Sequence, residues 1–239
     1  GIWLNSPNSI LSTGNTITLT GRLTVSAGTV NIGNGTNEDL LSSGGTFSVT
    51  GGVVNVAGKY YSTGINNITY FTMSSGTINV PTSLSTSTGD SPFQITGSGS
   101  SFNMSGGLIV IQKEGGNGAQ NLGYKNTGTT YGSVTGGTLQ IGNAATPAAQ
   151  IMGINSTFPV GYLNINSANA TGSLTTNSLN IINNVTINSG TLNAGSLNTT
   201  LGGNWVNNGG THTPGTGTTT FSSTAAQSIF KAAGENFYN

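Results

Sequence analysis

The sequence predicts an all-β protein, a right-handed parallel β-helix of about nine rungs with about 24 residues in each rung. Two observations lead to this fold. Short apolar runs alternate with period two, which is typical of strands. One motif also recurs along most of the chain, and several of its copies follow one another at the same interval. Three short strands and three turns fit into one such interval, which is the pattern of a solenoid.

The repeated motif reads apolar-x-apolar-x-x-Gly-x-apolar-x-apolar. Its glycine permits a positive φ and a sharp change of direction between two strands. Diverged copies begin at Trp3 and Trp205, and they bring the number of units to about nine. The seven clearer copies are LTVSAGTVNI (23–32), FSVTGGVVNV (47–56), FTMSSGTINV (71–80), FNMSGGLIVI (102–111), GSVTGGTLQI (132–141), STFPVGYLNI (156–165) and VTINSGTLNA (185–194). Their anchor glycines are Gly28, Gly52, Gly76, Gly107, Gly137, Gly161 and Gly190.

Within each copy the alternation separates a core side from a solvent side. Val30 and Ile32 are expected to point inward, whereas Thr29 and Asn31 point outward. Amides stacked on neighbouring rungs can hydrogen-bond along the rod, so a structural role explains the outward row. That row is expected to contain Asn31, Asn55, Asn79, Gln140, Asn164 and Asn193, with Val110 as the exception. A third short strand is expected before each anchor, at Ile17 and Leu19, Leu41, Ile65, Leu179 and Ile181.

A β-sandwich is the competing fold, because its turns also recur at short intervals. It does not explain why one motif returns at a fixed interval, so the β-helix is preferred. The best candidate for a helix is the segment 223–234.

The composition excludes several classes of protein. Five acidic and five basic residues balance formally among 239 residues. So little charge predicts no nucleic-acid partner and no anionic membrane surface as a partner. The chain has no cysteine, which excludes disulfides, thiolate metal sites and a catalytic thiol. No apolar run approaches the ~18 residues of a membrane span, so no membrane insertion is expected. The start at Gly1 is interpreted as that of a processed protein or a fragment.

Catalytic chemistry has little support in the sequence, and the protein is expected not to be an enzyme. Glycoside hydrolysis normally uses two carboxyl groups within ~5–10 Å. Glu38 and Asp39 are the only acids close in sequence, and adjacent strand residues point to opposite faces. A solvated turn is the preferred interpretation of this pair. His212 is the only histidine, and no metal-ligand spacing occurs, so we expect no catalytic residue, no metal and no cofactor.

Threonine rows raise the possibility of ice binding. Flat threonine arrays on a β-helix can bind ice, but at the position after the anchor glycine threonine alternates with larger residues. It reads Thr29, Val53, Thr77, Leu108, Thr138, Tyr162 and Thr191. A solvated face of residues with high strand propensity is the preferred interpretation.

The departures from the common repeat interval indicate where a ligand would bind, because insertions in a solenoid form loops on its side. The chain is expected to form one domain over 1–239, with a side-loop insertion at 112–132 and a diverged terminal module at 202–239. Tyrosine among small polar residues is suited to carbohydrate or protein contact. The alternative is that these tyrosines pack loops against the rod. The candidate contact residues are Tyr60, Tyr61, Lys113, Glu114, Tyr124, Lys125 and Tyr131.

The segment 202–230 resembles a module of repetitive secreted surface proteins, or adhesins, of Bacteroidota-type bacteria. The pattern is Gly-x-Trp-x-Asn-x-Gly-Gly, then Pro-Gly-x-Gly, a phenylalanine that ends a strand, and Gln-x-Ile. The matching residues are Trp205, Asn207, Gly209, Pro214, Gly215, Gly217, Phe221, Gln227 and Ile229. The resemblance implies an extracellular, non-enzymatic protein with a repetitive β-helix. The rest of the chain is similar to such proteins in general style only.

These observations predict a structural or adhesive protein at the cell surface, either self-assembling end to end into a filament or forming part of a long adhesin. Its expected partners are further copies of itself or a surface glycan or protein. A carbohydrate-binding or polysaccharide-cleaving β-helix is the alternative, and ice binding is a remote one.

Overall fold

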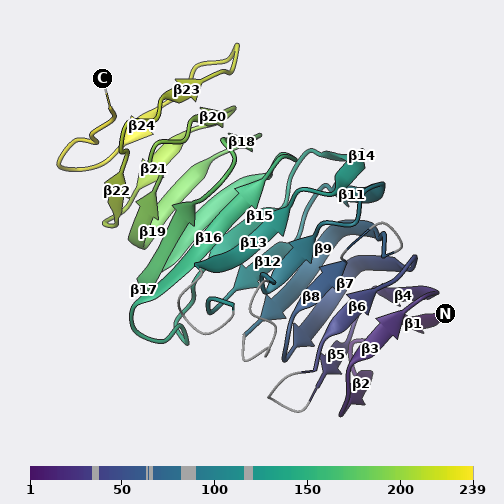
Figure 1. The fold of residues 1–239 in the computed structure, drawn as a ribbon. Helices are drawn as coiled ribbons and strands as arrows, with labels where there is room; N and C mark the ends of the chain where they lie inside the picture. The colour runs from purple at the N-terminus through teal and green to yellow at the C-terminus, as the bar shows by residue number, and fades with distance from the viewer. Residues whose placement is uncertain (34–37, 63, 65–66, 82–89, 116–120, 239) are drawn as a thin grey trace.

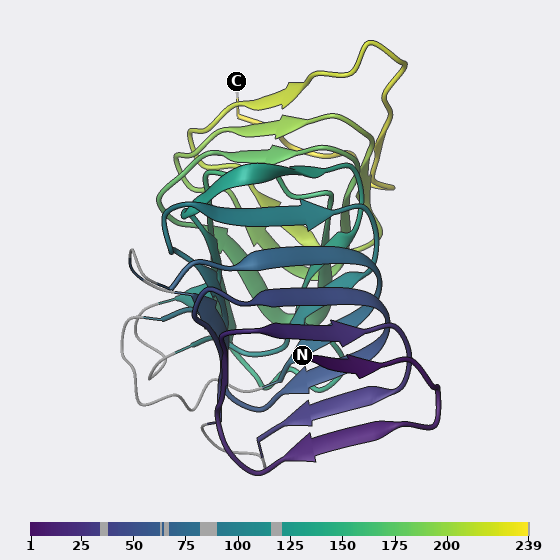
Figure 2. The same ribbon diagram turned by 90° about the vertical axis from the view of Figure 1, so that its right-hand side faces the viewer.

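The chain winds into a parallel β-helix, in which each turn adds one strand to each of three faces (Figure 1). The computed structural model describes residues 1–33, 38–62, 64, 67–81, 90–115 and 121–238. Within these residues there is no helix, and every pair of named strands is parallel. Successive strands of each face are stacked along the rod from the N-terminal to the C-terminal rung (Figure 2). The predicted parallel β-helix is therefore confirmed.

Face A contains the strands that precede the anchor glycines. It begins with β1 (Ile2–Leu4), β4 (Arg22–Val25), the first part of β7 (Thr46–Val56), the first part of β9 (Tyr70–Val80), β11 (Ser100–Met104) and β14 (Thr129–Val134). On the next rung Val160 pairs with Ile181 in an isolated parallel β-bridge, and Ile181 belongs to the last part of face A. This part contains β18 (Leu179–Ile181), β20 (Thr199–Leu201) and β23 (Thr219–Phe221).

Face B follows the anchor glycines. Its strands are β2 (Ile10–Thr13), β5 (Thr29–Ile32), the second parts of β7 and β9, β12 (Leu108–Ile111), β15 (Thr138–Ile141), the first part of β17 (Tyr162–Leu174), the first part of β19 (Val185–Asn193), β21 (Trp205–Asn207) and β24 (Ile229–Phe230).

Face C completes each rung. Its strands are β3 (Ile17–Leu19), β6 (Leu40–Ser42), β8 (Tyr60–Ser62), β10 (Phe93–Ile95), β13 (Leu122–Asn126), β16 (Gln150–Ser156), the second parts of β17 and β19, and β22 (Thr211–Thr213). In the described residues the strands of the three faces form nine complete rungs, and β23 and β24 begin a tenth.

The anchor glycines make the corner between faces A and B. The φ angles of Gly28, Gly52, Gly76, Gly107 and Gly137 lie between 69° and 84°. A Cβ on Gly52 would lie 2.5 Å from the carbonyl oxygen of Gly28 on the rung below. A side chain would therefore be strained by its backbone conformation and would also clash with the next rung. This is why glycine recurs at this corner.

The seventh anchor, Gly190, was assigned to the wrong corner. The first part of β19 pairs with face B, where Val185 lies opposite Leu163, and its second part pairs with face C. Gly190 therefore lies between faces B and C. The third-strand assignment was wrong in part as well. Ile17 and Leu19 lie in β3 and Leu41 lies in β6, both on face C as predicted. Leu179 and Ile181 lie on face A instead, and Ile65 is outside the described residues.

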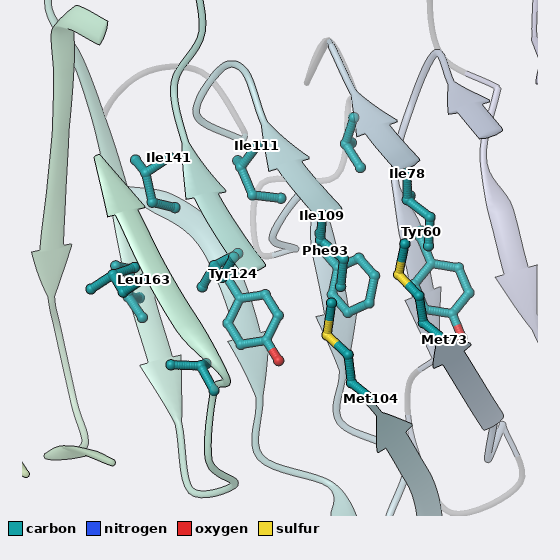
Figure 3. Close-up of a cluster of buried hydrophobic side chains, with 14 of the residues drawn as sticks. Tyr60, Met73, Ile78, Phe93, Met104, Ile109, Ile111, Tyr124, Ile141 and Leu163 are labelled. Atoms are coloured by element: carbon teal, nitrogen blue, oxygen red, sulfur yellow. The ribbon is translucent and has the colours of Figure 1, made fainter. Parts of the chain in front are cut away.

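Aromatic rings fill part of the described core, and Figure 3 shows several of them beside aliphatic side chains. Phe71 and Phe102 lie opposite each other on neighbouring rungs, and their rings are stacked with centroids 4.8 Å apart. Tyr60, Phe93 and Tyr124 form a second row on face C. Burying such rings supplies a large part of the hydrophobic stabilisation of the rod.

The outward amides form the predicted ladder in two sections. In the first, Asn79 Nδ2 donates to Asn55 Oδ1 at 2.9 Å, and Asn55 Nδ2 donates to Asn31 Oδ1 at 2.8 Å. Val110 interrupts the row. The second section joins Gln140, Asn164, Asn188 and Asn208. Asn193 was wrongly placed in this row, since it lies on face C opposite Ser173.

The predicted side loop 112–132 is wrong in its extent. β13 and most of β14 lie within it; β13 pairs with strands on both neighbouring rungs, and β14 pairs with β11. Before β13, residues 112–115 and 121 lie outside the named strands, and 116–120 lie outside the described residues. The terminal module 202–239 continues the β-helix through β21, β22 and β23. The segment 223–234, the best candidate for a helix, contains β24 instead.

Candidate functional site

Two of the predicted contact residues, Tyr60 and Tyr124, are buried in the core. The Tyr60 and Thr69 hydroxyls share a hydrogen bond of 2.7 Å, and Asn126 Nδ2 donates to the Tyr124 hydroxyl at 3.4 Å. Burial raises the pKa of both phenols. The prediction that these two tyrosines are available to a ligand is therefore wrong.

Tyr61 and Lys125 lie in one outward column of face C. Gln94 stands between them, because Tyr61 pairs with Gln94 and Gln94 pairs with Lys125. The structure thus brings together two of the predicted contact residues that are far apart in sequence.

Lys113 and Glu114 precede β13 on the chain. The backbone N–H of Glu114 donates to Gln150 Oε1 at 3.2 Å, and the Glu114 side chain is largely buried. Burial raises the pKa of Glu114, although the N–H of Ile151 and the charge of Lys113 oppose this shift. Glu114 is therefore held against β16, close to face C.

Tyr131 lies apart from these residues, on face A. Its side chain is exposed, and it pairs with Ser101 of β11. The predicted set is thus divided between a buried pair, the surface around face C and an exposed position on face A.

A charged cluster lies at the corner between faces B and C. Lys59 Nζ contacts Asp90 Oδ2 at 2.7 Å, and the Lys59 side chain is only 4% exposed. Gln94 Nε2 donates to Asp90 Oδ1 at 2.7 Å. On the other side, the backbone N–H of Lys59 donates to Asp39 Oδ1 at 2.8 Å. One buried lysine is therefore flanked by two carboxylates.

The electrostatics of the cluster follow from its burial. Burial raises the pKa of Asp39, while the N–H and the charge of Lys59 oppose the shift. Lys59 Nζ lies 4.6 Å from the centre of the Tyr61 ring, and burial together with Asp39 and Asp90 raises the pKa of that phenol. Among the described residues, no group of three or more histidine or acidic side chains could hold a metal ion.

Sequence reasoning missed this cluster because Asp39, Lys59 and Asp90 look scattered along the chain. Their separations of 20 and 31 residues each correspond to one rung of the β-helix. The repeat interval was the available signal, since residues one rung apart are neighbours in space. The cluster joins three rungs at one corner of the rod.

A hollow of about 240 Å³ opens on face C, close to the cluster. Lys125 and Asn155 line it, and Asn177 Nδ2 donates to Asn155 Oδ1 at 2.7 Å. Ser91, which follows Asp90, lines it as well. The donors and acceptors of this lining are suited to a small polar group rather than to a metal ion.

The C-terminal segment covers part of the last rung. Trp205 Nε1 and Asn207 Nδ2 donate to Glu235 Oε2 at 2.9 and 2.7 Å, and Lys231 Nζ contacts Glu235 Oε1 at 2.9 Å. Phe237 packs against Trp205, with ring centres 5.2 Å apart. We call residues 231–238 the C-terminal cap.

His212 lies beneath this cap and is buried. Its ring is 4.6 Å from that of Trp205, and its Nδ1 is 3.2 Å from the carbonyl oxygen of Asn236. Burial lowers the pKa of His212, against the opposing effects of Glu235 and the Asn236 carbonyl. These contacts explain His212 as part of the packing at the end of the rod.

Comparison with protein-family models, curated proteins and solved structures found no match to this chain. In the part of the chain that the structure describes, no helix is long and apolar enough to span a membrane.

Proposed function

We propose that this protein is a non-enzymatic structural or adhesive rod at the cell surface, and that its ends join further rungs. The observation that carries the proposal is that each end of the rod exposes one apolar side chain of an inward row, and at the C-terminal end this side chain lies outside the cap that covers Trp205 and His212. Further rungs come from another copy of the chain, which gives a filament, or from adjoining repeats of a long adhesin. A surface glycan or another surface protein is the alternative partner.

Ile2 and Ile229 are the two residues concerned. Ile2 lies opposite the buried Leu23, and Ile229 lies opposite the buried Trp205. Each isoleucine lies in the inward row of the buried residue that it pairs with, but Ile2 is 47% and Ile229 is 52% exposed, because no described strand covers them. Stacking another rung on either end would remove this apolar surface from water.

The backbone at the ends favours the same contact. Among the described residues, β1, β2 and β3 each pair with a strand on one side only, as do β23 and β24. Unpaired strand edges are templates for pairing with another chain. A contact between unlike ends does not close on itself and therefore gives an open filament.

Sedimentation velocity of the purified chain over a range of concentrations tests this proposal. We expect wild-type protein to form species larger than a monomer, and Ile2→Lys to remain monomeric, because a charge would have to be buried at the joint. Tyr162→Lys is the matched control, since Tyr162 is an exposed position on the lateral face B. Monomers of the wild-type protein at all concentrations would contradict end-to-end assembly.

Polysaccharide cleavage is a second candidate, and the cluster of Asp39, Lys59 and Asp90 is the observation that favours it. Two carboxylates beside a lysine are groups that acid–base chemistry uses. A reducing-sugar assay with wild-type protein, Asp39→Asn and Asp90→Asn tests this candidate. Release of sugar ends by the wild-type protein alone would favour the enzyme over the structural rod.

Ice binding is a remote third candidate. Thr29, Thr77 and Thr138 do lie in one column of face B, but Val53 and Leu108 alternate with them. Absence of thermal hysteresis in a solution of the protein would dispose of this candidate.

A further inference from the structure

Two exposed tyrosines stand in one column of face A. Tyr70 of β9 pairs with Ser101 of β11, and Ser101 pairs with Tyr131 of β14. The tyrosines are 46% and 67% exposed, with only a serine between them. Neighbouring strands are about 4.8 Å apart, so the two positions are about 10 Å apart along the rod.

A β-bulge gives Tyr131 its outward position. Ser100 pairs with Thr129 but Ser101 pairs with Tyr131, so Thr130 is an extra residue in β14. If the strands paired without the bulge, Thr130 would lie opposite Ser101 and Tyr131 opposite the buried Phe102. Gly132 takes that inward position instead, where a Cβ would clash with the Phe102 carbonyl oxygen. Bulges often re-aim a side chain in this way.

A column of small polar side chains lies next to the tyrosines. It consists of Thr72, Asn103 and Ser133 on successive rungs. Asn103 Nδ2 donates to Ser101 Oγ at 3.1 Å, and the N–H of Ser133 donates to Asn103 Oδ1 at 3.1 Å. These bonds fix the orientation of the Asn103 amide.

A shallow hollow of about 160 Å³ opens along this polar column. All of its lining residues are uncharged: Thr72, Met73, Asn103, Met104, Ser105, Ser133 and Thr135. The surface thus combines exposed aromatic rings with neutral hydroxyl and amide groups. The lining offers no charge that would recognise an anionic or cationic ligand.

We propose that face A, between Tyr70 and Tyr131, binds a neutral polysaccharide chain that lies along the rod. A sugar ring has an apolar C–H face that stacks on an aromatic ring, and hydroxyls that need neutral donors and acceptors. Successive rings of an extended polysaccharide repeat at nearly the spacing of the rungs. Rings two apart in the polymer would therefore stack on Tyr70 and Tyr131, while Thr72, Asn103 and Ser133 bond to their hydroxyls.

This binding face does not depend on the proposed end-to-end assembly, and it would give the rod the glycan partner that is the alternative there. End-to-end assembly depends on the ends of the rod, whereas face A in rungs four to six is lateral. Either proposal can fail without the other.

Affinity electrophoresis in gels that contain one polysaccharide each tests the inference. The probes are neutral β-glucan, mannan, galactan and xylan, with alginate as an anionic polymer. We expect at least one neutral polymer to slow the wild-type protein. Titration calorimetry with an oligosaccharide of that polymer should then show roughly 3- to 10-fold weaker binding for Tyr70→Ala and for Tyr131→Ala.

The controls separate stacking from general damage to the fold. Tyr131→Phe keeps the ring and should bind as the wild-type protein does. Tyr162→Ala removes an exposed tyrosine from face B and should also leave binding unchanged. Retardation by none of the neutral polymers, retardation by alginate alone, or unchanged binding in both Tyr70→Ala and Tyr131→Ala would overturn the proposal.

Discussion

Lys59 carries a positive charge into a corner of the β-helix where water has little access. Asp90 and Asp39 approach it from the rungs on either side, one through the ammonium group and the other through the backbone N–H. Removing one member of a buried ion pair usually costs more than replacing both by neutral groups, because it leaves a buried charge without its partner.

Asp90→Asn should therefore lower the free energy of unfolding by roughly 3 kcal/mol, the lower end for a buried pair, because the Asp90 side chain is 22% exposed. The double variant Lys59→Met with Asp90→Asn should recover part of this loss, since it removes the buried charge as well. Urea denaturation followed by circular dichroism measures both. If the single variant unfolds at the same urea concentration as the wild-type protein, the cluster does not hold this corner together.

Tyr60 and Tyr61 show how far the sequence can assign a single residue. They are adjacent, so one must point inward and the other outward. The segment around them has no clear alternation of apolar and polar residues, so the register cannot be read from the sequence. The pairing of Tyr60 with Phe93 resolves the choice, because both side chains extend the same buried row.

At the scale of elements, the repeated motif predicted the corner between faces A and B and much of the amide ladder. It failed at β19, where the motif copy at 185–194 lies at the corner between faces B and C. Later rungs are shorter, since Asn204 follows Asn184, its neighbour on the preceding rung, by only 20 residues. In a shorter rung the strands of faces B and C lie closer together in the sequence, so one copy of the motif can span either corner. The motif copy at 132–141 found only the end of β14, and the motif did not find β13, which lies in a segment rich in glycine and polar residues.

The C-terminal cap and the side chains beneath it contain two groups whose pKa is lowered by their surroundings, Glu235 and His212. Burial by itself would raise the pKa of Glu235, but hydrogen bonds from Asn207, Lys231 and Trp205 and the Lys231 charge hold it below its ordinary value. Burial also lowers the pKa of His212. Both groups bind protons more weakly in the folded cap than in an unfolded one, so acid favours opening of the cap.

We therefore expect the cap to loosen in two steps. The first begins as the pH falls below 6.5, the ordinary pKa of histidine, and the second begins below 4.5, the ordinary pKa of glutamic acid. A Trp3→Phe background leaves Trp205 as the only tryptophan, and its emission should shift to longer wavelength as water reaches it. In that background His212→Gln should remove the first step. Unchanged emission through both pH ranges would contradict this account of the cap.

At the scale of the whole molecule, nine rungs are held together by contacts between neighbours. The same rows continue from rung to rung, and they end at Ile2 and Ile229 with apolar side chains exposed. A solenoid of this kind gains stability with every rung added, because each new rung buries the one before it. A further rung at either end would cover the exposed side chain of Ile2 or of Ile229.

Fibre diffraction from an aligned sample of the assembled protein tests end-to-end assembly most directly. Strands lie across the rod, so stacking at the ends continues the strand spacing along the filament axis. We predict a strong reflection at about 4.8 Å along that axis. Filaments whose reflection at this spacing lies across the axis would show lateral association of the rods, and they would contradict the proposed assembly.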